Sequence, residues 1–141
     1  MFVLDTNVIS ELRQGKPRQS PEVRAWAASH PASQLFLSAI CILELEKGVL
    51  ALERETPPAG SALRIWLTGV RATFASRLLP FTESTATVCA AMHIPNPRPD
   101  RDAMIAATAL EHGMTMVTRN IADFAGTGVQ LVNPFATVSK S

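Results

Sequence analysis

The sequence has no apolar run close to the ~20 residues that a membrane-spanning helix requires. Its N-terminus also lacks the basic start of a secretory signal, because an acid already stands at position 5. Only two cysteines occur, Cys41 and Cys89, and both lie in apolar stretches far apart in the chain. We therefore expect buried free thiols rather than a disulfide, a cytoplasmic protein and no membrane partner.

Several common catalytic motifs are also missing. The sequence contains neither a glycine-rich phosphate loop of either common spacing nor a Gly-x-Ser-x-Gly nucleophile elbow. Its three histidines, His30, His93 and His112, have no metal-ligand spacing and fall near expected helix ends. No histidine is placed to activate a cysteine. We expect these histidines to be structural, so the chemistry must come from other residue types.

What the chain does contain is the pattern of one compact α/β domain. It has 141 residues, 47% of them hydrophobic and 18% charged, enough for a substantial core. Short apolar segments predict strands at 2–4, 35–37, 78–81, 116–118 and 129–132. Helical patterns separate these segments, which predicts a parallel sheet covered by helices on both faces.

Boundary signals place the helix ends. Ser20 followed by Pro21 predicts an N-cap and first helical position, and Gly113 is expected to end the last helix. The segment Pro-Pro-Ala-Gly at 57–60 is the strongest breaker, and it predicts a linker between two long helices that pair as an antiparallel hairpin. That hairpin is the expected surface for dimer or partner contacts.

Four acids follow the carboxyl ends of the predicted strands. Asp5 ends the first strand directly, and Asp123 lies a few residues past the fourth. Asp102 begins a helix that leads back to a strand, and Glu44 lies about two turns into the helix after the second strand. Sites in open parallel sheets form at this edge. Because clustered carboxylates repel and Mg²⁺ or Mn²⁺ relieves the repulsion, we predict a metal site there.

Each acid also has an ordinary structural interpretation. Asp5 fits a helix cap, Glu44 a solvated helix residue, Asp102 a helix-start acid and Asp123 a turn residue. The apolar neighbours of Glu44 favour a partner or an ion instead. Asp100 is an alternative to Asp102 as a ligand. The apolar helix that follows Asp102 favours Asp102, with Asp100 as the N-cap.

The charge distribution bears on the partner. A net charge of +1 predicts no polyanionic partner by itself. If four acids gather at one site, however, 8 of the 12 acids remain against 13 basic residues. Ten of those basic residues are arginine, whose side chain suits bidentate phosphate contacts. This balance is compatible with a nucleic-acid substrate.

Several segments together resemble PIN-domain proteins. They are Leu4-Asp5-Thr6-Asn7-Val8-Ile9-Ser10, Ser38 with Glu44-Leu45, Asp102 to Ala109, Val117 to Asn120 with Asp123-Phe124, and Asn133-Pro134-Phe135. Their order and spacing are similar to the VapC toxins of bacterial type II toxin–antitoxin modules, particularly the FitB-like branch. The similarity predicts a single PIN-like nuclease domain over 1–135 and a polar C-terminal tail over 136–141.

The resemblance implies a three-layer α/β/α sandwich around a central parallel sheet of four to five strands. It also implies a Mg²⁺- or Mn²⁺-dependent endoribonuclease whose products carry a 5′-phosphate and a 3′-hydroxyl. The implied catalytic and metal-binding residues are Asp5, Glu44, Asp102 and Asp123, and the supporting polar residues are Thr6, Asn7, Thr118 and Asn120. The implied partners are RNA, a cognate antitoxin and a second copy of the chain, with a dimer of toxin–antitoxin pairs as an extension.

Two rival hypotheses belong to other functional classes. A non-catalytic RNA- or protein-binding PIN module is one, although all four acids are present. An aspartyl-phosphate hydrolase with Asp5 as nucleophile is the other, but such enzymes usually need a second acid where this chain has Asn7. The proline-rich loop at 96–101 departs from the family pattern, and we hypothesise that its Arg98 and Arg101 contact phosphate.

Overall fold

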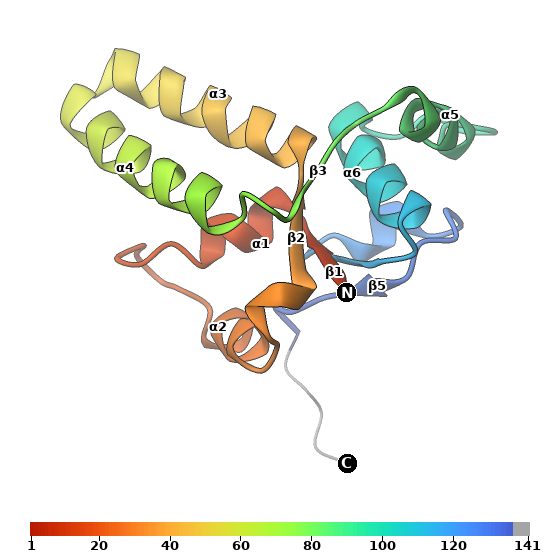
Figure 1. Cartoon of the computed structure of the whole chain (residues 1–141), viewed down its shortest axis with the longest axis horizontal. Coiled ribbons are helices and arrows are strands. Elements are labelled where there is room, and N and C mark those ends of the chain that lie inside the picture. Colours follow the sequence, from red (N-terminus) through yellow and green to blue (C-terminus); the bar gives the residue numbers. More distant parts are fainter. Residues whose placement is uncertain (137–141) are drawn as a thin grey trace.

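The computed structural model describes residues 1–136 and contains one five-stranded parallel sheet. The strand order is β3-β2-β1-β4-β5, so the first strand lies at the centre (Figure 1). The strands are β1 (Phe2–Leu4), β2 (Leu35–Ser38), β3 (Leu78–Leu79), β4 (Thr115–Val117) and β5 (Leu131–Val132). This arrangement confirms the predicted parallel sheet. Of the predicted tail, 137–141 lie outside the described residues.

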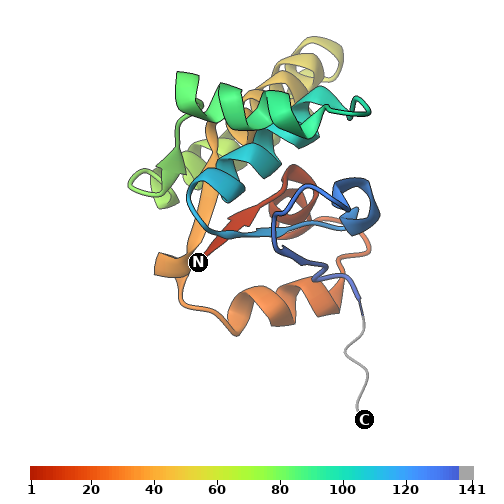
Figure 2. The same cartoon turned by 90° about the vertical axis from the view of Figure 1, so that its right-hand side faces the viewer.

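Helices cover both faces of the sheet, as the α/β/α prediction requires (Figure 2). They are α1 (Thr6–Glu11), α2 (Pro21–Ala28), α3 (Ala39–Glu55), α4 (Pro57–Thr73), α5 (Glu83–Met92) and α6 (Asp100–Glu111), with short 3₁₀ helices at Ala32–Gln34 (η1) and Ile121–Phe124 (η2). Neighbouring strand residues point to opposite faces, as the pleat dictates. Leu4 joins a first core cluster with α1 to α4, whereas Val3 joins a second cluster with α5 and α6.

The helix caps largely follow the sequence signals. The Ser20 hydroxyl accepts a hydrogen bond from the Val23 N–H, and Gly113 takes a φ of +65° after α6. The prediction of Asp100 as an N-cap is wrong. Pro99 occupies the cap with an extended backbone, so Asp100 is already the first helical residue, and its side chain is 84% exposed.

The predicted linker at 57–60 is also wrong, although the predicted helical hairpin is confirmed. Thr56 alone separates α3 from α4, and both prolines lie in the first turn of α4. Proline is tolerated there because the first N–H groups of a helix have no partner within the helix. Gly60 is buried in the same turn, where a Cβ would lie 2.4 Å from the Glu53 Cα. The glycine therefore allows the two helices to approach closely.

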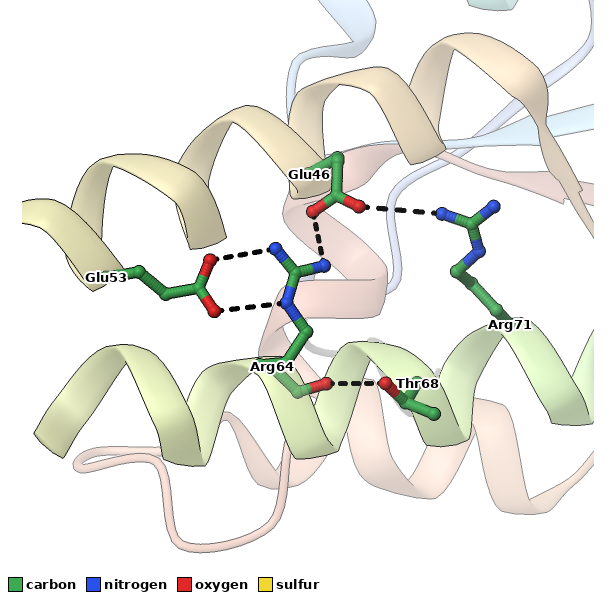
Figure 3. A network of polar contacts seen from close by, with 5 residues as sticks. All are labelled: Glu46, Glu53, Arg64, Thr68 and Arg71. Carbon is green, nitrogen blue, oxygen red and sulfur yellow. Dashed lines mark hydrogen bonds and ion pairs between the residues drawn. The ribbon is translucent and has the colours of Figure 1, made fainter. Parts of the chain in front are cut away.

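A polar network joins the two helices of this hairpin (Figure 3). Arg64 on α4 donates two hydrogen bonds to the Glu53 carboxylate, at 2.9 and 3.2 Å, and a third to Glu46 at 2.5 Å. The Arg64 guanidinium lowers the pKa of Glu53 through these bonds. Arg71 lies 3.7 Å from the other Glu46 oxygen. The network ties α4 to α3, the helix that carries Glu44.

Candidate active site

Asp5 lies at the junction of β1 and α1, in the centre of the sheet. Its side chain is only 3% exposed and accepts three hydrogen bonds. The Thr6 N–H donates to Oδ1 at 2.8 Å, and the Thr118 hydroxyl and Asn7 amide donate to Oδ2 at 2.8 and 3.2 Å. Asp5 is therefore the N-cap of α1, as one interpretation predicted, and it also faces the carboxyl edge of the sheet.

Thr6 links Asp5 to Glu44. Its backbone N–H binds the Asp5 carboxylate, and its hydroxyl donates to the Glu44 Oε1 at 2.6 Å. Glu44 lies on α3, between the buried Cys41 and Leu45, and is itself half-buried. One threonine thus orients two acids from separate elements.

Asp102 in the first turn of α6 faces the other three acids. Partial burial, followed by the charges of Asp5, Glu44 and Asp123, raises the pKa of Asp102. Burial likewise raises the pKa of Asp5, and the Glu44 charge adds to this effect, while hydrogen bonds partly offset it. Asp100 is not among the charges that shift Asp102. Asp102, rather than Asp100, is therefore the acid that is coupled to Asp5, Glu44 and Asp123 at the carboxyl edge of the sheet. We call this edge the rim.

The four acids share one rim without forming a closed set of ligands. Among residues 1–136, no three histidine, cysteine, aspartate or glutamate side chains are close enough together to hold a metal ion. The donor set nevertheless fits Mg²⁺ or Mn²⁺, because both ions prefer carboxylate oxygens. Burial raises the pKa of Asp5 and Asp102 most, and repulsion from neighbouring acids adds to it; a cation would relieve that repulsion. The assignment of four metal ligands stays a prediction.

The chain is similar to the proteins of one known family. The model of the PIN domain matches residues 2–128. The chain belongs to the PIN-domain family. It is 37% identical to VapC ribonuclease Y4jK from Sinorhizobium fredii over 96% of the chain and 98% of that protein. It is 34% identical to toxin FitB from Neisseria gonorrhoeae, over 96% and 99% respectively. A solved structure of FitAB bound to an IR36 DNA fragment has a TM-score of 0.87, with 32% identity and full coverage of both chains.

The predicted supporting residues of this PIN domain surround Asp5 and Glu44. Thr6, Asn7 and Thr118 contact the acids through their side chains, as described above. Asn120 contributes its backbone N–H, which donates to the Thr118 hydroxyl at 3.1 Å. The Arg119 N–H donates to the Asn7 side chain at 3.3 Å. The segment after β4 therefore holds both side chains that bind the Asp5 Oδ2.

Arg98 has a structural role that the sequence did not reveal. Its guanidinium donates to the backbone oxygens of Asp123 and Ala125, at 2.7 and 2.9 Å. These bonds do not support the hypothesis that Arg98 contacts phosphate. Arg101, in contrast, is exposed at the start of α6.

Cys41 lies beneath the acids and is chemically inert. Burial raises the pKa of its thiol to about 12, so the thiolate is absent at neutral pH. Both cysteines are free and buried, which confirms the prediction made for them. Cys41 is therefore excluded as a nucleophile in this PIN domain.

A groove of about 290 Å³ opens beside Glu44. Thr6 and Glu44 form one end, Arg13 and Lys16 contribute basic side chains, and Trp66 on α4 forms an apolar wall. Glu44 is the one of the four acids that lines this groove. In residues 1–136, no helix is both long and apolar enough to cross a membrane.

The raised pKa of Asp102 leads to a prediction for the metal-free protein. Because the folded pKa lies above the ordinary value of 3.8, ionisation of Asp102 costs folding free energy at pH values above 3.8. Asp102→Asn should therefore raise the melting temperature at pH 7, and the gain should fade as the pH falls through the folded pKa toward 3.8. Thermal melts in EDTA across this pH range measure the effect. The exposed Asp100→Asn is the control, and a gain that is independent of pH would contradict the prediction.

Proposed function

We propose that this PIN-domain protein is a metal-dependent endoribonuclease and the toxin of a type II toxin–antitoxin module. The observation that carries the proposal is the position of Thr6, which binds the carboxylates of both Asp5 and Glu44 at the carboxyl edge of the sheet. Burial and then the charges of Asp5, Glu44 and Asp123 raise the pKa of Asp102, which supports the same site. Relatives named VapC ribonuclease and toxin FitB, each matched over nearly their whole length, support the same function. The nuclease domain is proposed to span 1–135.

The four acids would hold Mg²⁺ or Mn²⁺, directly or through water. Such an ion, when bound, lowers the pKa of a water and stabilises charge on a phosphodiester. The protein's own residues prepare the acids for this task. Thr118 and Asn7 fix the orientation of the Asp5 carboxylate, and Thr6 fixes Glu44. Hydrolysis is proposed to leave a 5′-phosphate and a 3′-hydroxyl.

Arg101 and Arg119 are proposed to bind the RNA backbone. Both are exposed beside the acids, and the Arg119 guanidinium lies 3.8 Å over the Phe135 ring, which limits its freedom. Replacing either with Ala should weaken RNA binding and reduce the slope of log K against log salt by about 0.7–0.9. Binding of a single-stranded RNA to Asp5→Asn protein, titrated from low to high salt, measures this slope. Arg24→Ala on α2 is a control, and an unchanged slope in both variants would rule out the assignment.

The proposed protein partner is a cognate antitoxin that blocks the site. Support comes from the FitB relative, since the solved FitAB structure matches this chain over its full length. A homodimer, or a dimer of toxin–antitoxin pairs, is the proposed assembly, and the α3–α4 hairpin is the proposed contact surface. The buried free thiols are consistent with action in the cytoplasm.

The direct test is cleavage of total cellular RNA by purified protein, with mapping of the cut sites. Cleavage that requires Mg²⁺ or Mn²⁺ and stops in EDTA supports the proposal. Growth arrest on expression, relieved by the product of a neighbouring gene, supports the toxin role separately. RNA binding without cleavage under any divalent ion would instead favour the non-catalytic PIN module.

A further inference from the structure

The loop between α5 and α6 reaches across to the segment that carries Asp123. Its Arg98 donates three hydrogen bonds to backbone oxygens. Nε binds Met92 at 2.9 Å, Nη1 binds Asp123 at 2.7 Å and Nη2 binds Ala125 at 2.9 Å. One planar guanidinium therefore joins the end of α5 to the segment around η2.

Arg98 is itself firmly held. Its backbone N–H donates to the His93 Nδ1 at 3.1 Å, and His93 is the C-cap of α5. Its side chain is half-buried, and the Met92 carbonyl that it binds belongs to a residue of the second core cluster. The guanidinium thus has a fixed position relative to the core.

The η2 segment is otherwise held by Phe124 and by short-range backbone bonds, such as the one from the Asp123 N–H to the Asn120 oxygen at 3.1 Å. Phe124 is 2% exposed and anchors the segment in the second core cluster. Asp123 is exposed, and η2 has only four residues and no side-chain cap. The bonds from Arg98 fall on each side of Phe124 and tie η2 to the end of α5.

We propose that Arg98 is a positioning residue that sets where the Asp123 carboxylate stands relative to the other three acids. The inference rests on the proposed function. It requires arginine, because a guanidinium presents several donors in a rigid fork, whereas a lysine ammonium is a single point on a flexible stem. Arg98 acts through Asp123 and does not itself contact the metal or the RNA.

The test compares Arg98→Met, which keeps an unbranched side chain but has no donors, with Arg24→Met as the control, at an exposed arginine on α2. Mn²⁺ affinity is measured without RNA, from the free-ion signal in electron paramagnetic resonance. Hydrogen exchange of amides 121–126 is measured on the metal-free protein. Arg98→Met should weaken Mn²⁺ binding about 10-fold and speed exchange in 121–126, because partners that orient metal ligands typically cost this much when removed. Arg24→Met should do neither.

A double-mutant cycle separates positioning from general destabilisation. In the Asp123→Asn background, Arg98→Met should cause no further loss of Mn²⁺ affinity, because the residue it positions is already gone. If Arg98→Met does not fold, Arg98→Lys takes its place and should give a smaller loss with the same coupling. Additive losses, unchanged Mn²⁺ affinity or unchanged exchange at 121–126 would overturn the inference. A wild-type protein that neither binds Mn²⁺ nor cleaves RNA would overturn the proposed function itself, and with it this role for Arg98.

Discussion

Replacing Asp5 with Asn is expected to abolish RNA cleavage while the protein stays folded. Asn has nearly the same shape and keeps one oxygen, so it can still accept the hydrogen bond from the Thr6 N–H and cap α1. The substitution removes the charge of the only one of the four acids that lies in the central strand–helix junction, 3% exposed. Cleavage should fall by about 10³-fold, the upper range for loss of one electrostatic group in an active site.

The experiment measures initial cleavage rates with Mg²⁺ and with Mn²⁺, beside circular dichroism of both proteins. Asp100→Asn is the matched control, because it makes the same chemical change at an acid that is exposed and that points to His93. This control should retain near wild-type activity. Full metal-dependent cleavage by Asp5→Asn would disprove the assignment of Asp5, and loss of activity in Asp100→Asn would reopen the choice between Asp100 and Asp102.

Among the substitutions proposed for this protein, Gly60→Ala is expected to lower the free energy of unfolding most. The added Cβ would lie 2.4 Å from the Glu53 Cα and 2.5 Å from the Glu53 backbone N. Both are backbone atoms, so no side-chain rotation relieves the clash and α3 must move away from α4. The free energy of unfolding should fall by about 3 kcal/mol, at the upper end of overpacking costs. Urea denaturation measures the change.

Gly69→Ala, in the same helix, is the control with the opposite sign. A Cβ there meets no atom within 4 Å in the described part of the chain. Alanine at an open helical position should raise stability by up to ~1 kcal/mol, because glycine is a poor helix former. Equal effects of the two substitutions would show that helix propensity, rather than the close approach at Glu53, decides the outcome.

The sequence predicted the fold well because its signals are local. Apolar segments of a few residues mark each strand, and the Ser20 cap and the Gly113 end are read from single residues. The errors at 57–60 and at Asp100 have one cause. Proline near a helix start is compatible with either a break or a first turn, and only the packing of neighbouring elements decides between them.

The sequence predicts a set of acids at one edge of the sheet, which stays a prediction, but not the contacts that hold them. The rule that parallel sheets place sites at their carboxyl edge brought Asp5, Glu44, Asp102 and Asp123 together. The hydrogen bond from Thr6 to Glu44 joins residues 38 positions apart, and no sequence pattern encodes it. Arg98 was hypothesised to contact phosphate because it lies in a basic, proline-rich loop just before Asp102. Its three carbonyl partners come from segments whose proximity appears only in the fold.

The rim belongs to two separately packed halves of the molecule. Glu44 lies on a helix whose buried side packs in the first core cluster, whereas Asp102 and Asp123 lie on elements packed in the second. Asp5 directly follows β1, whose residues Val3 and Leu4 belong to the second and the first cluster respectively. A divalent cation bound by all four would act as a crosslink between the halves, so loading the site would stabilise the whole fold by mass action. RNA cleavage and the stability of the fold would then depend on the same four carboxylates.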